Sequence, residues 1–195
     1  MVSAVSIVLI GPPAAGKSAV GSLLGPLLGC DFVDADEVAG PFYAEVGWSV
    51  ERLLGLSGES GYEAAHAAWE VALAHAVERL VDHHADAVIA LGAGHTHVTS
   101  QLLFERVGAA LRSVDGVVLL RPSPDLQTTI RVLRERCLTS KGRDWRVDGI
   151  DWLERWTTDG RDELLATTTI YNARDSAGET ARRLAWVLQS RTNSG

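Results

Sequence analysis

The sequence predicts an α/β fold in which helices cover a parallel β-sheet. Short apolar runs, typical of buried strands, alternate along the chain with longer stretches that have helical spacing. The first apolar run, residues 5–10, leads into a glycine-rich loop and then into a helical stretch. With 195 residues, the chain is long enough for one domain of this kind and too short for two ordinary ones.

The composition narrows the range of partners. Hydrophobic residues make up 46% of the chain and charged residues 22%, as in a globular protein. The net charge of −7 argues against a nucleic-acid surface, which needs a basic stripe. No apolar run reaches the length of a membrane span, and no basic segment precedes an apolar one at the N-terminus. We therefore expect a cytoplasmic protein, a monomer or weak dimer, that binds neither nucleic acid nor membranes.

The loop after the first strand carries a phosphate-binding motif. Residues 11–18, Gly-Pro-Pro-Ala-Ala-Gly-Lys-Ser, match the P-loop pattern G-x-x-x-x-G-K-[ST] between a strand and a helix. Its glycines let the backbone turn so that successive N–H groups point at phosphate oxygens at the helix N-terminus. Lys17 would neutralise the β- and γ-phosphates, and the Ser18 hydroxyl would hold Mg²⁺.

Eight residues are predicted to contact the nucleotide: Gly11, Pro12, Ala14, Ala15, Gly16, Lys17, Ser18 and Ala19. The alternative interpretation is a Gly/Pro turn between a strand and a helix, with an incidental Lys-Ser pair. The order of strand, loop and helix favours the phosphate-binding interpretation.

The second predicted strand, residues 31–37, ends in the acidic pair Asp34 and Asp36. Residues two apart in a strand point to the same side, and an α/β sheet gathers its ligands at the carboxyl ends of its strands. One carboxylate could hold the hydration shell of Mg²⁺ while the other accepts a hydroxyl proton. The alternative is a solvated turn in which Asp36 caps a helix that begins at Glu37.

Together, the loop GPPAAGKS and the segment FVDADEV resemble the start of shikimate kinase and its relatives among the P-loop metabolite kinases. The resemblance implies a three-layer α/β/α fold with a five-stranded parallel sheet, formed by residues 1–195 as a single domain. The implied parts are a core (1–36, 86–134 and 166–195), a helical substrate-binding insertion (37–85) and a lid (about 136–150).

The resemblance also implies an activity, which is transfer of the γ-phosphoryl group of ATP to a hydroxyl of a small molecule, with Mg²⁺ as cofactor. Lys17 would be catalytic. Asp34 would organise Mg²⁺ through water, and Asp36 would contact the acceptor hydroxyl as a further catalytic residue.

The insertion departs from the family pattern where the substrate is expected. Residues 41–81 have helical spacing, with Ser49 as a helix N-cap. Where shikimate kinases have an aromatic residue and an arginine that grips the substrate carboxylate, this chain has Tyr62 and Glu63. A glutamate would repel a carboxylate, and basic residues are scarce in the insertion, so we expect a neutral or cationic acceptor. Many of the acidic residues could instead form a solvated helix face.

The third predicted strand, residues 86–91, ends at Gly92, Ala93 and Gly94. The family has three glycines here, and their backbone approaches the acceptor closely. All three residues are therefore predicted to bind the substrate, and the extra methyl group of Ala93 alters the shape of the pocket.

Several histidines have no assigned role. His95 and His97 follow the glycine segment, and we expect them to be exposed loop residues, with a metal site or a substrate contact as the alternative. His66 is likewise expected to be an ordinary surface or cap residue.

The C-terminal third is basic. Further strands are predicted at residues 116–120 and 167–171, and a helix at 126–136. Arg136 lies where the family's lid motif begins, so it is the candidate catalytic arginine that covers the transferring phosphoryl group. Arg143 and Arg146 compete for this role, and a solvated basic helix end is the alternative.

A last helix before the fifth strand is predicted at residues 149–165. Arg161 matches the family's arginine that contacts the substrate carboxylate. Trp152 and Trp156, four residues apart, would pack this helix onto the body of the protein, or would form a stacking surface for a ligand.

Three functions remain open from the sequence. The first is a kinase of a neutral or cationic acceptor, such as an aminocyclitol, sugar, nucleoside or antibiotic. The second is a true shikimate kinase whose carboxylate site is built on Arg161 alone. The third is an ATP-binding regulatory module that has lost phosphoryl transfer.

Overall fold

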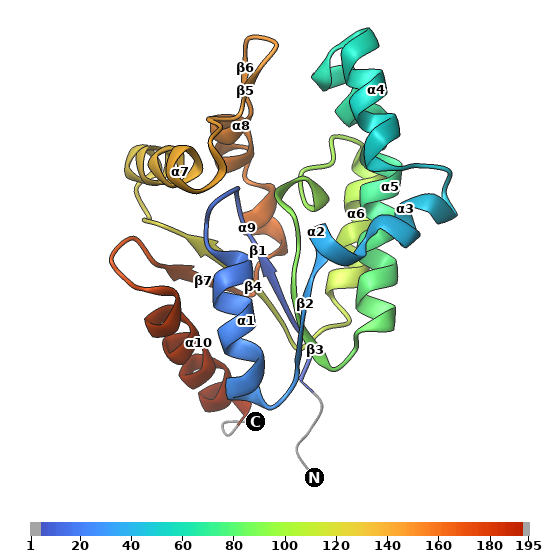
Figure 1. Cartoon of the computed structure of the whole chain (residues 1–195). Helices are drawn as coiled ribbons and strands as arrows, with labels where there is room; N and C mark the ends of the chain where they lie inside the picture. The colour runs from blue at the N-terminus through green and yellow to red at the C-terminus, as the bar shows by residue number, and fades with distance from the viewer. Residues whose placement is uncertain (1–4, 193–195) are drawn as a thin grey trace.

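The computed structural model describes residues 5–192, and the side chains of all of these except residues 141, 191 and 192. Its centre is an all-parallel sheet with the strand order β2-β3-β1-β4-β7 (Figure 1). The strands are β1 (Ile7–Ile10), β2 (Asp31–Asp34), β3 (Ala87–Ala90), β4 (Gly116–Arg121) and β7 (Thr168–Tyr171). The predicted α/β fold with five parallel strands is confirmed.

Helices cover both faces of this sheet (Figure 1). They are α1 (Lys17–Leu28), α2 (Ala35–Val38), α3 (Gly40–Glu45), α4 (Val50–Ser60), α5 (Tyr62–His83), α6 (Gln101–Leu111), α7 (Leu126–Lys141), α8 (Trp152–Thr158), α9 (Arg161–Leu165) and α10 (Ala177–Thr192), with a 3₁₀ turn η1 (Ala93–His95). None of the helices within residues 5–192 is both long enough and apolar enough to cross a lipid bilayer.

The two faces of the sheet are both apolar because both are buried. In β1, Ile7 and Leu9 belong to the cluster that packs under α1 and α10. Val8 and Ile10 point to the opposite face, where they pack with residues of α5 and α6. A strand that is covered on both sides has no polar face, which explains its continuous apolar run.

The register places the functional ends of the strands at one edge. Asp34 pairs with Ala90 at the carboxyl ends of β2 and β3, and Leu9 pairs with Ala90 between β1 and β3. The P-loop, the acidic pair and the glycine segment therefore leave the sheet side by side.

The second strand is shorter than predicted, and the acidic pair does not lie on it. β2 ends at Asp34, and Asp36 lies in the first turn of α2. The Asp34 carboxylate accepts a hydrogen bond from the Asp36 backbone N–H at 3.1 Å, so Asp34 and not Asp36 is the N-cap. The capping bond favours the helix over continuation of the strand. The Ser49 cap of α4, which accepts from the Arg52 N–H, is confirmed.

The lid region also differs from the prediction. α7 continues to Lys141, and the predicted helix at 149–165 is divided into a hairpin, α8 and α9. The hairpin strands β5 (Arg146–Val147) and β6 (Ile150–Asp151) are antiparallel. Asp148 and Gly149, which connect them, have φ of 53° and 76°. An Asp-Gly pair with two positive φ angles is typical of a two-residue hairpin turn.

Two helical glycines offer a matched test of how closely α1 packs on the start of β2. A Cβ atom on Gly25, in α1, would lie 2.9 Å from the carbonyl oxygen of Cys30, whereas one on Gly55, in α4, would meet no atom within 4 Å. We expect Gly25→Ala to lower the free energy of unfolding by about 1 kcal/mol, because steric overlap outweighs the gain in helix propensity. Gly55→Ala should raise it by up to about 1 kcal/mol. Urea unfolding measures both variants, and a stabilised Gly25→Ala would contradict the close packing of α1 on the start of β2.

Candidate active site

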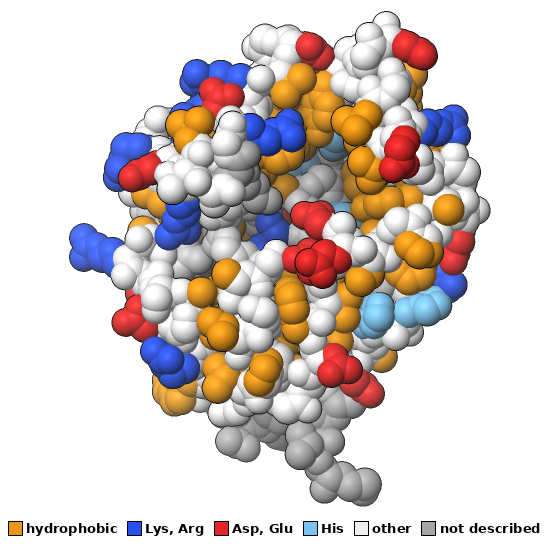
Figure 2. Space-filling view, in the orientation of Figure 1, with side chains coloured by type: hydrophobic (Ala, Val, Ile, Leu, Met, Phe, Trp, Pro, Cys, Tyr) orange, Lys and Arg blue, Asp and Glu red, His pale blue; other side chains and the backbone are white. Residues whose placement is uncertain are grey.

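A cavity of about 1000 Å³ opens at the carboxyl ends of the strands. Its walls come from the P-loop, the start of α2, the glycine segment, α4, α5 and α7, together with Trp145 and Trp156. Figure 2 shows the hollow in the upper half of the molecule, with apolar side chains around it and acidic side chains at its lower rim. The segments that the register brings to one edge of the sheet thus share one cavity.

The P-loop turns sharply at the end of β1. Gly11, Ala14 and Gly16 all have positive φ, at 136°, 60° and 97°. A Cβ atom on Gly11 would lie 2.5 Å from the carbonyl oxygen of Leu120 in β4, so this position requires glycine. The Lys17 amino group donates to the carbonyl oxygens of Gly11 at 2.7 Å and Pro12 at 3.0 Å.

The predicted nucleotide contacts separate into two groups. The residues of the P-loop and α1 that line the cavity are Pro13, Ala14, Gly16, Lys17, Ser18 and Ala19. Gly11, Pro12 and Ala15 lie outside the lining, and Gly11 and Pro12 hold the Lys17 amino group through their carbonyls. The loop therefore supplies both a lining and a support for its lysine.

Asn172, directly after β7, is a site residue to which the sequence analysis gave no role of its own. Its side chain donates to the carbonyl oxygen of Ala15 at 2.8 Å. Arg136 donates to the Asn172 side-chain oxygen at 3.3 Å and to its backbone carbonyl at 3.1 Å. Asn172 is buried, and it joins α7 to the P-loop. A polar residue just beyond the last strand was the available signal.

Of the three candidate lid arginines, Arg136 lines the cavity. The Arg143 guanidinium lies 3.9 Å from the centroid of the Trp145 ring, and the Arg146 side chain is 60% exposed and paired with Asp151. Arg136 is thus the candidate whose side chain is already beside the P-loop.

Asp34 and Asp36 both line the cavity, although they leave different elements. The Asp36 Oδ1 atom lies 2.3 Å from where a Cβ atom on Gly92 would be, so the carboxylate rests directly on the glycine backbone. The Ser18 hydroxyl and the Asp34 carboxylate are hard oxygen donors, which suit Mg²⁺ bound mainly by water and phosphate.

The His95 side chain holds the glycine segment, residues 92–94, in place through the Gly92 carbonyl. The expectation that it is exposed was wrong, because it is 2% exposed. Its Nδ1 donates to the Gly92 carbonyl at 3.1 Å, and its Nε2 accepts from the Tyr43 hydroxyl at 2.9 Å. Burial lowers the pKa of His95, and burial together with Asp36 raises the pKa of Tyr43, so both groups are neutral. The fully bonded neutral pair holds Gly92 against Asp36.

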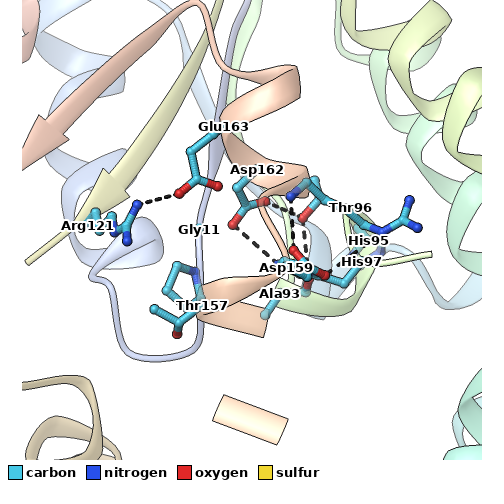
Figure 3. A network of polar contacts seen from close by, with 12 residues as sticks. Gly11, Ala93, His95, Thr96, His97, Arg121, Thr157, Asp159, Asp162 and Glu163 are labelled. Atoms are coloured by element: carbon cyan, nitrogen blue, oxygen red, sulfur yellow. Dashed lines mark hydrogen bonds and ion pairs between the residues drawn. The ribbon is translucent and has the colours of Figure 1, made fainter. Parts of the chain in front are cut away.

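His97 is also buried, at 3% exposure, which corrects the same expectation. Figure 3 shows it close to two carboxylates, Asp159 directly after α8 and Asp162 in α9. Its Nδ1 lies 2.7 Å from Asp159 and its Nε2 lies 3.3 Å from Asp162, while Thr96 donates to Asp162 at 2.6 Å. Burial alone would lower the pKa of His97, but Asp162 and Asp159 outweigh it and raise the pKa to about 9. A charged imidazolium therefore ties the glycine segment to α8 and α9.

His66 on α5 is buried rather than at the surface, which was also predicted wrongly. Its ring lies between Trp152, at 5.2 Å between centroids, and Trp156, at 6.0 Å. Burial lowers its pKa to about 4, so the ring is uncharged at neutral pH. Trp152 and Trp156 pack α8 onto α5, as predicted, and Trp156 also lines the cavity.

Tyr62 and all three residues of the glycine segment line the cavity, whereas two other predicted acceptor contacts lie outside it. The Glu63 side chain is 58% exposed and pairs with Arg155 at 2.6 Å. The Arg161 guanidinium lies 4.7 Å from the centroid of the Phe104 ring. The structure does not bring Glu63 and Arg161 together with the acidic pair.

The charge on His97 predicts a pH dependence of stability. The pKa of His97 is about 9 in the folded protein, whereas an ordinary histidine has a pKa of 6.5. Between pH 6.5 and 9 the folded protein therefore binds more protons than the unfolded protein. We expect the free energy of unfolding to fall by roughly 2 kcal/mol as pH rises from 6.5 to 9. His66, whose pKa is lowered, acts only below pH 6.5 and with the opposite sign.

Denaturant unfolding at several pH values measures this slope. His97→Gln should remove most of it, and His83→Gln, at an exposed position on α5, should retain it. An unchanged slope in His97→Gln would show that the imidazole is neutral in the folded protein.

Known proteins resemble this chain in sequence. The family model for shikimate kinase matches residues 13–148. A shikimate kinase of Corynebacterium efficiens is 36% identical over 102 residues, which are 51% of this chain and 53% of that relative, so the match spans about half its length.

Solved structures agree over nearly the whole chain. The shikimate kinase from Acinetobacter baumannii in complex with shikimate has a TM-score of 0.67 and 20% identity, and covers 97% of this chain and 95% of that one. Shikimate kinase from Aquifex aeolicus has a TM-score of 0.63 and 20% identity, with 97% and 99% covered. At this identity the structures show the fold, and the family model identifies the family. The chain belongs to the shikimate kinase family.

Proposed function

We propose that this protein transfers the γ-phosphoryl group of ATP to a hydroxyl group of a small molecule. One observation carries the proposal: the P-loop, with Lys17 and Ser18, and the acids Asp34 and Asp36 line the same cavity. The P-loop can hold the phosphates of ATP, and an acid in the same cavity can take the proton that an acceptor hydroxyl loses. Family membership supports the same conclusion.

The proposed step is an in-line displacement. The acceptor oxygen forms a bond to the γ-phosphorus while the bond from that phosphorus to the β–γ bridging oxygen breaks, and ADP leaves. Asp36 takes the proton that the acceptor hydroxyl loses. Lys17 and Arg136 stabilise the negative charge on the transferring group. Ser18 and Asp34 would hold Mg²⁺, which supplies charge neutralisation of the phosphates when bound.

A neutral or cationic acceptor suits the lining. Among the lining side chains that the structure describes, the lysine and arginine are Lys17 and Arg136, both beside the P-loop. The acceptor end instead holds Asp36 and neutral rings. A carboxylate there would be desolvated without a charged partner, which is unfavourable.

True shikimate kinase activity is the second candidate, because the family model and the solved relatives favour it. It would require a carboxylate site built from groups other than Glu63 and Arg161 in their present positions. The two candidates predict opposite rankings of shikimate against uncharged acceptors in a turnover assay.

We also propose that residues 37–85 form the acceptor-binding insertion and residues 136–150 the lid. In support, α5 supplies Tyr62 to the cavity wall, and the Asp148 carboxylate of the hairpin accepts the Tyr62 backbone N–H at 2.7 Å. The two proposed parts therefore meet beside the cavity.

The role of Asp36 is tested by Asp36→Asn, which keeps the size of the side chain and removes the base. We expect transfer to fall by about 10²- to 10⁴-fold while the Kd for magnesium-ATP changes little. Coupled ADP release and calorimetry measure the two quantities. Asp31→Asn, at the opposite end of β2, is the matched control and should retain activity. If wild type and Asp36→Asn both bind ATP without transfer, the protein is a nucleotide-binding module.

The close contact between the Asp36 carboxylate and Gly92 is tested by Gly92→Ala. The backbone at Gly92 suits any residue, with φ −62° and ψ 151°. An added Cβ atom would lie 2.3 Å from Asp36 Oδ1 and 2.9 Å from His95 Nδ1, so we expect displacement of Asp36 and of the His95 ring rather than backbone strain. We expect kcat to fall by roughly 10- to 100-fold at an unchanged KM for ATP. Gly55→Ala is the control, since a Cβ atom there would meet no atom within 4 Å and Gly55 lies outside the cavity lining. Equal losses in both variants would contradict a specific role for the contact with Gly92.

A further inference from the structure

We infer that the acceptor carries an aromatic ring close to the hydroxyl group that receives the phosphoryl group. This inference rests on the proposed function and adds the chemical class of the acceptor. Its basis is the wall of the cavity beyond Asp36, which is built largely from aromatic side chains of two separate parts of the chain.

The first side of this wall belongs to α5. Tyr62, His66 and Trp69 all line the cavity, and the rings of Tyr62 and His66 lie 5.8 Å apart. Successive positions on one face of the helix bring these rings into a row. Trp69 is held in place by Tyr43, whose ring lies 5.0 Å away in an edge-on arrangement. Since Tyr43 also bonds His95, this side is continuous with the support of the glycine segment.

The second side belongs to the lid region and α8. Trp145 and Trp156 line the cavity, with their rings 5.2 Å apart and inclined at 64°. His66 lies 6.0 Å from Trp156, so the two sides meet at the end of the cavity. The edge-to-face contacts are favourable geometries for aromatic pairs, and a further ring between the two sides would have similar partners.

The backbone at Trp145 has a conformation that is unusual for a bulky residue. Its φ of 62° lies in the left-handed region, which a bulky side chain seldom adopts and which is costly. The surroundings over-determine this conformation: the Trp145 carbonyl accepts from the Trp152 N–H at 3.0 Å, and Arg143 covers the ring. Such strain is commonly retained at ligand sites.

The charges on this wall also favour an aromatic acceptor. Its histidine is uncharged, and Val50 and Leu53 of α4 add further apolar surface. An aromatic ring would exchange water for ring contacts here, and the Arg143 guanidinium is already stacked on Trp145. Among the acids that line the cavity, Asp36 is assigned to the hydroxyl end of the acceptor.

Four alcohols distinguish the possible acceptors: 1-phenyl-1,2-ethanediol, 1-cyclohexyl-1,2-ethanediol, glucose and shikimate. Coupled ADP release gives kcat/KM for each with magnesium-ATP. We expect the phenyl compound to exceed glucose and shikimate by at least about tenfold and to exceed its cyclohexyl analogue. The inference is overturned if shikimate, glucose or the cyclohexyl compound has the highest value.

Binding separates the failure of this inference from the failure of the proposed function. If none of the four alcohols is phosphorylated, calorimetry of each with the protein and magnesium-ADP decides the matter. Tighter binding of the phenyl compound supports an aromatic site and counts against the transfer activity alone. Absent or weaker binding of the phenyl compound overturns the inference.

The variant Trp145→Gly removes one ring and also suits the positive φ, so the hairpin should keep its backbone. We expect the KM for the phenyl compound to rise by roughly tenfold, and the KM for ATP to change less than about twofold. Trp186→Ala is the control, because Trp186 on α10 is 70% exposed and lies outside the cavity lining. Equal changes in the two KM values, or no change, would count against stacking on Trp145.

Discussion

The turn that the chain makes after β1 is the constraint on which the site depends. Gly11 passes so close to the carbonyl of Leu120 in β4 that no side chain fits between them. This contact directs the P-loop over the carboxyl edge of the sheet, where Asn172 holds the Ala15 carbonyl from β7. On the other side of β1, β3 and β2 bring the glycine segment and the acids to the same edge. A parallel sheet thus converts its strand order into the layout of the cavity.

Three buried histidines show how position sets charge. At His95 and His66, desolvation by burial outweighs the nearby carboxylates Asp36 and Glu70 and keeps both rings uncharged. His97 is equally buried, but two carboxylates surround it and favour the imidazolium. The neutral histidine can both donate and accept, which suits a relay from Tyr43 to Gly92. The charged one can only donate, which suits a clamp between acids.

The sequence predicted the elements whose signals are local. The P-loop, the apolar strands and the Ser49 cap each depend on neighbouring residues and were located from them, although β2 ends three residues earlier than predicted. The hairpin had a local signal too, the pair Asp148-Gly149, which the helical interpretation of residues 149–165 overlooked. The burial of His95 and His97 had no such signal. Their partners, Tyr43 and the acids of α8 and α9, lie more than fifty residues away and become neighbours only in the folded chain.

The hydrogen bond between Asp148 and the Tyr62 N–H has a consequence for exchange of ligands. A single carboxylate on the hairpin satisfies the first backbone donor of α5, the helix that supplies half of the ring-lined wall. Moving the hairpin outward leaves that donor to water and loosens the first turn of α5. An outward movement of the hairpin would therefore also loosen the ring-lined wall, because one hydrogen bond joins the two.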